Sequence, residues 1–541
     1  MKIPPRIFIV LTTLLLGSCS FLQEEYHSGQ GVETVITSAS TLHKQAVLSL
    51  YSYLGSDVDG KGLQGTYRGI YDLQTFASNE AIIPVRGGDW LDGGLWLDLY
   101  AHTWTEDNEA CENAWLYLYG LIGQCNNSLA MIEAYSKQLL TEEQHHTYTA
   151  EVRALRAMCY MYLMDLFGNV PVVTEAGTSV HDMKQSPRSE VFDFVWQQLQ
   201  DALPYLTDER SNPRGAYYGR ITYPVACFLL AKMALNAEVW TDDDWTDEEH
   251  PDGKTILLQC GQTPMTAWEA VKYYCNAIFR SAVGSELCES QTECFAVYNE
   301  DAKENIFTIP MDPAMYPTRF KNLFRSLHYQ HAAALGYGGE NGSCATLETL
   351  DVFGYGTPSQ DCRFAITFFA GTVRVNGRPL VLSNGDTLVY QAREVKPVLT
   401  GTPYVATAGA RMHKYAFDAG GIMDGQLRNN DIVLFRLADV YLMIAEAKVR
   451  NGEDGQTEFD RVRSREALAL NMSIQPRQAT LENIYYERWI ELMWEGWHRQ
   501  DQIRFGKYAD SPLDRYLTVF PIPQTALQTN YYLTQNKGYD D

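Results

Sequence analysis

The densest group of residues that could do chemistry lies between Arg86 and Trp96, in the run Arg-Gly-Gly-Asp-Trp-Leu-Asp-Gly-Gly-Leu-Trp. Its four glycines permit tight turns, and Trp90 and Trp96 offer flat apolar faces on which sugar rings can stack. The run predicts a carbohydrate platform whose contact residues are Arg86, Asp89, Trp90 and Trp96. The alternative is a structural turn whose tryptophans fill the core, because tryptophan is mostly buried in folded proteins.

A second group consists of Glu487, Glu491 and Glu495, which are spaced four apart inside a helix expected over 479–505. Side chains at this spacing lie along one face of a helix, and paired carboxylates can hydrolyse glycosides. Arginines occur close by in the same segment, which favours a structural ion-pair network over catalysis. The sequence also contains no HExxH, GxSxG, phosphate-loop or dinucleotide motif. The familiar enzyme signatures are therefore absent, and a glycosidase that uses these carboxylates stays the weaker alternative.

Metal sites have little support. The segment 57–62 opens like a calcium loop, but Lys61 occupies its fifth position, so an EF-hand is rejected. The acidic run 240–249 is more typical of a solvated loop than of a cation site. Ten cysteines besides Cys19 contain no CxxC pair, and most are expected to be buried thiols. We assign no metal site and no cofactor, although a structural Ca²⁺ without assigned ligands stays open.

The first residues form a processing signal. Lys2 and Arg6 precede the apolar stretch 7–16, which is too short to span a bilayer, and Gly17 and Ser18 lead into Cys19. This pattern is typical of a bacterial lipoprotein signal. We expect cleavage after residue 18 and lipidation of Cys19, which would anchor the chain to a membrane.

Composition narrows the partners of the remaining chain. The formal net charge is −24, which argues against nucleic acid or an anionic membrane surface as a partner. Aromatic residues make up 12% of the chain, with 34 tyrosines and 11 tryptophans, and this supplies stacking faces for neutral ligands. No later apolar run reaches about 18 residues, so nothing else is expected to cross a membrane.

Apolar periodicity predicts a mainly α-helical chain. The expected helices cover 34–54, 108–137, 141–167, 188–206, 223–239, 267–282, 432–451, 456–469 and 479–505. Many form adjacent pairs, which suggests a tetratricopeptide-like scaffold without a clean sequence repeat. Between 307 and 420 the chain is glycine-rich, and Asn376-Gly377 and Asn384-Gly385 are hairpin signals. We expect an irregular, loop-rich lobe at 307–420 between helical parts at 19–306 and 421–541, all in one compact unit.

Three C-terminal blocks form a recognisable set. The first, 430–447, contains an arginine, Ala-Asp and Ala-Glu-Ala; the second, 487–506, contains Glu-Arg, Glu-Gly-Trp and Arg-Phe-Gly; the third, 520–538, contains Phe-Pro-Ile-Pro and Gln-Asn-Lys-Gly. In this order the blocks resemble the SusD/RagB-like nutrient-binding outer-membrane lipoproteins of Bacteroidetes. Upstream, 150–171 and the glycine- and tryptophan-rich segment 86–96 are also similar to that family. His498 departs from it, because many members have arginine at this position.

The resemblance implies a function as well as a fold. Such proteins are helical, with tetratricopeptide-like pairs and an irregular binding lobe, and they carry out no catalysis. They sit on the outer membrane, facing the exterior, over a SusC-like TonB-dependent transporter. They capture an oligosaccharide, or sometimes a peptide, and deliver it to that partner. From the matching segment, Arg86, Trp90 and Trp96 carry over as binding residues.

Overall fold

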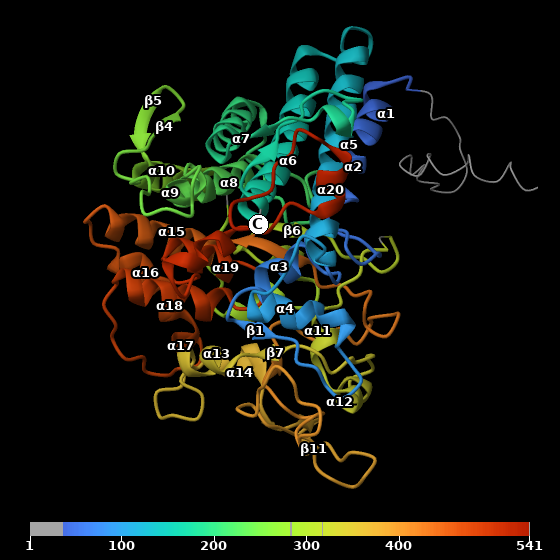
Figure 1. Cartoon of the computed structure of the whole chain (residues 1–541), viewed down its shortest axis with the longest axis vertical. Coiled ribbons are helices and arrows are strands. Elements are labelled where there is room, and N and C mark those ends of the chain that lie inside the picture. The colour runs from blue at the N-terminus through green and yellow to red at the C-terminus, as the bar shows by residue number, and fades with distance from the viewer. Residues whose placement is uncertain (1–35, 282–283, 316, 540–541) are drawn as a thin grey trace, which may run out of the picture.

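The computed structural model describes residues 36–281, 284–315 and 317–539. The predicted signal and Cys19 lie outside the described residues. Within this part of the chain helices dominate, and the strands are short and belong to two-stranded sheets. Helices occupy the upper part of the view in Figure 1, and the loop-rich segment that carries β11 forms the lower end. The mainly α fold with an irregular lobe is confirmed.

The scaffold is built from helices that pack in sequence-adjacent pairs. Two long helices, α5 (Glu109–Leu139) and α6 (Glu142–Phe167), form the first pair. At the start of α6, the Thr141 hydroxyl accepts a hydrogen bond from the Gln144 backbone N–H, and the Gln144 side chain accepts one from the Thr141 N–H. This is the capping box that the sequence predicts. The remaining scaffold helices are α7 (Arg188–Ala202), α8 (Tyr223–Leu235), α10 (Ala267–Ser281), α15 (Leu437–Arg450), α16 (Gln456–Arg463) and α18 (Leu481–Leu492).

The lobe contains the hairpins that its sequence signals. β10 (Arg374–Val375) and β11 (Arg378–Pro379) pair across Asn376-Gly377. A second turn at Asn384-Gly385 closes the bridge between Val381 and Thr387. Asn-Gly suits such turns because both residues tolerate positive φ angles.

The segment predicted as one helix over 432–451 begins differently. Ile432–Arg436 is strand β14, which pairs antiparallel with β6 (Asn305–Ile309), and α15 starts only at Leu437. Every residue of both strands is buried. A short apolar run that is buried on both faces carries no alternation, and the run was therefore indistinguishable from a helix start. The prediction of helix at 432–436 was wrong.

The helix predicted over 479–505 is also broken. α18 ends at Leu492 and α19 (His498–Arg504) follows after five residues. Within the break, Trp494 has a φ of 68° and Gly496 a φ of 75°, which are left-handed conformations that no α-helix contains. Glu495 therefore lies in the break, and only Glu487 and Glu491 share a helical face.

One core joins the helical parts and the lobe. The main cluster of buried apolar side chains draws on residues from Leu42 to Leu533 and includes Phe364 and Phe368 of the lobe. None of the helices in the described ranges is both long and apolar enough to cross a membrane. The division at 306/307 and 420/421 stays a prediction.

Candidate functional site

The glycine- and tryptophan-rich segment forms a tight turn fixed to the lobe. The backbone N–H groups of Arg86 and Asp89 each donate to the other residue's carbonyl, at 3.0 and 3.1 Å. Just before the turn, Val85 donates to the Pro397 carbonyl and accepts from the Leu399 N–H. The turn is therefore held by backbone bonds at its base, while Gly87 and Gly88 form its exposed tip.

Arg86 points into the protein and is only 4% exposed. Its guanidinium donates to the carbonyls of Gly342, Val405 and Ala408, at 3.2, 3.0 and 2.9 Å. Burial and the neighbouring Arg411 lower its pKa to about 9. In this conformation Arg86 ties the turn to two other segments of the lobe.

Trp96 is likewise internal. It belongs to α4 (Leu95–Ala101), is 1% exposed, and its indole N–H donates to the Asp92 carboxylate at 2.7 Å. Its ring packs edge-on against Phe76 and lies 5.6 Å below the Arg325 guanidinium. Trp96 thus supports the segment from beneath and presents no stacking face to solvent.

Trp90 is only partly buried, and its orientation is fixed. Its indole N–H donates to the Glu340 carbonyl at 2.9 Å, and its ring meets Trp96 edge-on at 5.9 Å. The ring also lies against Gly342, where an added Cβ would come within 2.6 Å of the Trp90 Cζ2 atom. Glycine at this position therefore makes room for the tryptophan.

Polar groups surround this ring at the surface. Asp89 is exposed and accepts a hydrogen bond of 2.6 Å from the hydroxyl of Tyr329, a residue that is 44% exposed at the start of α12 (Tyr329–Ala334). On the other side, the Tyr67 hydroxyl donates to the Glu340 carboxylate at 2.7 Å. We call Asp89, Trp90, Tyr329 and Glu340 the Trp90 platform. It offers one apolar ring next to two carboxylates and a hydroxyl.

Of the four predicted contact residues, the structure thus places Asp89 and Trp90 at the surface and Arg86 and Trp96 in the interior. Their role in binding stays a prediction. The sequence did not single out Tyr329 or Glu340, which come from segments 240 and 250 residues away. The aromatic and irregular character of the lobe was the only sequence signal for them.

The three glutamates of the second group lie in a buried ion-pair network. We call it the arginine-glutamate cluster; its members are Lys414, Arg363, Arg436 and Arg465 together with Glu304, Glu487, Glu491 and Glu495. Arg436 is central and contacts three of the glutamates, with its Nε 2.7 Å from the Glu495 carboxylate. Burial alone would raise the pKa of Glu491, but Arg465, Arg436 and Arg363 together hold it far below its usual range. The predicted structural network is confirmed.

A cavity of about 580 Å³ opens on the scaffold, between residues 238–252 and 503–518. Several of its polar lining groups already have partners, since His250 contacts the Asp242 carboxylate and Arg504 contacts Glu446. The cavity shares no lining residue with the Trp90 platform.

Two family models match the chain. Residues 84–235, which contain the whole Arg86–Trp96 segment, match a family described as "Starch-binding associating with outer membrane", and residues 400–517, which contain much of the arginine-glutamate cluster, match the SusD family. Both matched segments are therefore similar to SusD-family proteins.

Relatives extend this similarity over most of the chain. The starch-binding protein SusD of Bacteroides thetaiotaomicron is 22% identical over 527 residues, covering 89% of this chain and 88% of the relative. The SusD-like protein P25 of Formosa agariphila is 25% identical over 584 residues and covers both chains fully.

Solved structures of SusD-like proteins share the fold. Surface glycan-binding protein A from Bacteroides fluxus superposes with a TM-score of 0.70 at 19% identity, covering 92% of this chain and 99% of that one. A laminarin-binding SusD-like protein gives 0.69 at 20% identity, covering 93% and 100%. Surface glycan-binding protein A from Bacteroides thetaiotaomicron, in complex with laminarihexaose, gives a TM-score of 0.67 at 17% identity, covering 92% of this chain and 100% of that one.

Proposed function

We propose that this SusD-like chain is a cell-surface binding protein that captures oligosaccharides and delivers them to a SusC-like TonB-dependent transporter. Lipidated Cys19 anchors it in the outer membrane with the binding lobe facing the exterior. Support comes from the matching family, whose description names starch binding and the outer membrane, and from relatives named for binding starch, laminarin or glycan.

The observation that carries the proposal is the Trp90 platform. Sugars present apolar C–H faces and a rim of hydroxyls, so a site for them needs a fixed aromatic ring with hydrogen-bonding groups at its edge. Trp90 is fixed by the Glu340 carbonyl, and Asp89 and Tyr329 lie at the surface beside it. We assign direct sugar contacts to Asp89, Trp90 and Tyr329. Arg86 and Trp96 act as positioning residues beneath them.

Two alternatives make different demands on the same molecule. A peptide-binding member of the family would use the lobe to grip extended backbone. A glycosidase would need an accessible pair of carboxylates, one of them protonated. Glu487 and Glu491 are 0% exposed and paired with arginines, which favours binding over hydrolysis.

The test begins with a glycan array on the purified chain, followed by calorimetry with the best ligand. Replacing Trp90 by alanine should weaken binding roughly 10- to 100-fold, which corresponds to about 1 to 3 kcal/mol for a buried aromatic contact. Tyr531→Ala is the matched control, because this tyrosine is 91% exposed and lies on the segment after α20 (Gln524–Thr529). Unchanged affinity in the Trp90 variant contradicts the site. Binding of peptides alone would favour the first alternative, and release of shortened sugars the second.

The anchor and the transporter are tested separately. Cys19→Ala should move the protein from the membrane fraction to the soluble fraction, and the transporter should copurify with the unsubstituted chain. Persistence of the variant in the membrane fraction would contradict lipid anchoring at Cys19.

A further inference from the structure

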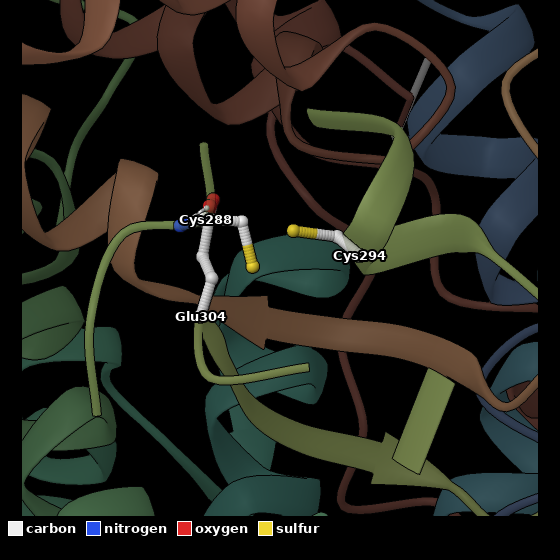
Figure 2. Close-up of side chains that lie close together, drawn as sticks. All are labelled: Cys288, Cys294 and Glu304. Atoms are coloured by element: carbon white, nitrogen blue, oxygen red, sulfur yellow. Dashed lines mark hydrogen bonds between the residues drawn. The ribbon is translucent and has the colours of Figure 1, made fainter. Parts of the chain in front are cut away.

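Two thiols meet beneath the surface where the chain passes from α10 to β6. Cys288 lies in the extended segment after α10, and Cys294 lies in the 3₁₀ turn Gln291–Phe295. Figure 2 shows their sulfur atoms pointing toward one another, with Glu304 beside them. The two sulfurs and a carboxylate oxygen of Glu304 all lie within 4.8 Å of one another. None of the sequence motifs singles out this group.

The third member of the group is already engaged. The Glu304 carboxylate accepts hydrogen bonds from Arg436 at 2.8 Å, from Arg465 at 2.6 Å and from the Cys288 backbone N–H at 3.1 Å. A cation bound by the thiols and Glu304 would lie next to two guanidinium groups and would compete with them for the carboxylate. These two arginine contacts therefore favour an uncharged bond between the two sulfurs over a metal complex.

The two thiols are chemically unequal. The neighbouring Cys294 thiol lowers the pKa of Cys288, although burial opposes the shift. Burial is the main cause that raises the pKa of Cys294. Burial also raises the pKa of Cys125 and Cys159, which lie inside α5 and α6. Since the thiolate is the reactive form, Cys288 is the better nucleophile of the pair.

Access to Cys288 comes through its own segment. Cys288 is 6% exposed, but both Glu286 and Glu289 are exposed. The stretch from Gly284 to Ser290 is itself in no helix or strand. For attack on an outside oxidant, this segment must move enough to expose the Cys288 sulfur.

We propose that Cys288 and Cys294 are a cross-linking site that forms an intrachain disulfide with a disulfide-bearing oxidant. The Cys288 thiolate attacks one sulfur of the oxidant's disulfide, which forms a mixed disulfide and releases the other sulfur as a thiolate. The Cys294 thiolate then attacks the Cys288 sulfur and displaces the remaining half of the oxidant. The chain loses two protons and two electrons, and the oxidant leaves as two thiols. The proposal rests on the proposed function only in placing the chain outside the cytoplasm, where disulfides persist.

The cross-link would fasten a segment that touches the arginine-glutamate cluster. Between the two cysteines, the Gln291 side-chain amide donates to the Glu491 backbone carbonyl at 2.7 Å and to its carboxylate at 3.0 Å. The Gln291 backbone N–H donates to Glu466 at 3.0 Å. A disulfide closing this short loop would hold Gln291 over the buried charges and slow the entry of water to them.

The test is oxidation of the reduced, folded chain with glutathione disulfide, followed by alkylation and peptide mapping. We expect one linked peptide joining residues 288 and 294, while Cys125 and Cys159 stay reduced and serve as internal controls. In Cys294→Ser, a glutathione adduct should accumulate on Cys288, whereas Cys288→Ser should gain no adduct on Cys294. Adding a reductant should speed unfolding of the oxidised chain at least several-fold and leave the double serine variant unchanged.

Two results would overturn the proposal. One is full alkylation of both cysteines after prolonged exposure to the oxidant. The other is one equivalent of Zn²⁺ bound by the reduced chain and lost in the double serine variant, which would make the group a metal site. Because none of these measurements involves a sugar, failure here and failure of glycan binding are distinguishable.

Discussion

The arginine-glutamate cluster and the Trp90 platform both contain side chains that do chemistry in other proteins, but their surroundings are opposite. In the cluster, Arg436 and its neighbours enclose Glu491 completely, and each carboxylate has a cationic partner. On the platform, Asp89 is exposed and accepts one hydrogen bond from a tyrosine, and Trp90 is only partly buried. Residue type alone does not separate the two regions; exposure and partners do.

The physical reason lies in the cost of burying charge. A carboxylate taken out of water must be paired and hydrogen-bonded, and the Glu491 oxygens accept from three arginines and Gln291. The cluster therefore serves the fold by joining α18 to β14 and to the lobe, since Arg436 comes from the strand and Arg363 from the lobe. On the platform, Asp89 and Glu340 each accept a hydrogen bond from a tyrosine hydroxyl and have no cationic partner among the ion pairs of the described residues.

The strongest test of this contrast removes the centre of the cluster. Arg436→Met should lower the free energy of unfolding by about 3 to 5 kcal/mol, because it leaves buried carboxylates without their partner. Urea unfolding at neutral pH measures the loss. Arg393→Met is the matched control, since its pair with Asp351 is about half exposed and should contribute about 0 to 1 kcal/mol. Equal losses in the two variants would contradict the distinction.

Acid should weaken the scaffold through the same kind of pair. Glu446 is fully buried and accepts hydrogen bonds from Arg504 and Arg450; burial opposes the shift, but these arginines lower its pKa to about 2. A carboxyl group with a lowered folded pKa stabilises the protein fully above its unfolded pKa of 4.5, and the contribution is lost as pH falls through about 2. At pH 3 the loss from this group should be about 2 kcal/mol.

Urea unfolding at pH 6 and pH 3 measures that loss, and Glu446→Gln removes the titrating group. The difference between the two pH values should shrink by about 2 kcal/mol in the variant. Glu133→Gln is the control, because the Glu133 side chain is 71% exposed. An unchanged pH dependence in Glu446→Gln would show that the acid sensitivity originates elsewhere.

The secondary-structure elements differ in how far the sequence predicts them. Helices with strong signals, such as the one that begins at Thr141, were predicted together with their capping box because those signals are local. The strand at Ile432–Arg436 was missed because its apolar run of four residues, Ile432 to Phe435, fits both structures. The break at Trp494 was missed because two positive φ angles depend on tertiary contacts, such as the Tyr71 hydroxyl that donates to the Trp494 carbonyl.

The site was predicted only in part for a related reason. Trp90 and Asp89 stood out because glycine, tryptophan and aspartate are adjacent in the chain. Their partners Tyr329 and Glu340 are placed by the lobe, and no local pattern connects them to residue 90. Burial of Arg86 and Trp96 follows from the same long-range packing, which residue type does not reveal.

The platform can be disturbed without removing any of its groups. In Gly342→Ala, the new Cβ would lie 2.6 Å from Trp90 Cζ2 and 3.1 Å from the Arg325 carbonyl, so the ring has to move. We expect a stability loss of about 1 to 3 kcal/mol from overpacking. Calorimetry should also show roughly tenfold weaker glycan binding, about 1.4 kcal/mol.

The matched control is Gly120→Ala on α5, where nothing lies within 4 Å of the added Cβ. This variant should bind glycan normally and gain about 0.5 to 1 kcal/mol of stability from helix propensity. Normal binding by Gly342→Ala would mean that the orientation of Trp90 does not matter for the ligand.

The smallest change sharpens the contrast most. Tyr329→Phe keeps the ring of the platform and removes only the hydroxyl that donates to Asp89 at 2.6 Å. Because that bond is exposed to water, the free energy of unfolding should change by less than about 0.5 kcal/mol. Glycan affinity should still fall several-fold, by roughly 0.5 to 1.5 kcal/mol, because Asp89 loses the partner that orients it. Tyr298→Phe, at a tyrosine that is 59% exposed outside the platform, is the control for calorimetry. Weaker glycan binding by Tyr329→Phe with unchanged stability would identify the Tyr329 hydroxyl as part of a binding surface. Equal glycan affinity in Tyr329→Phe and Tyr298→Phe would mean that the hydroxyl makes no contribution to binding.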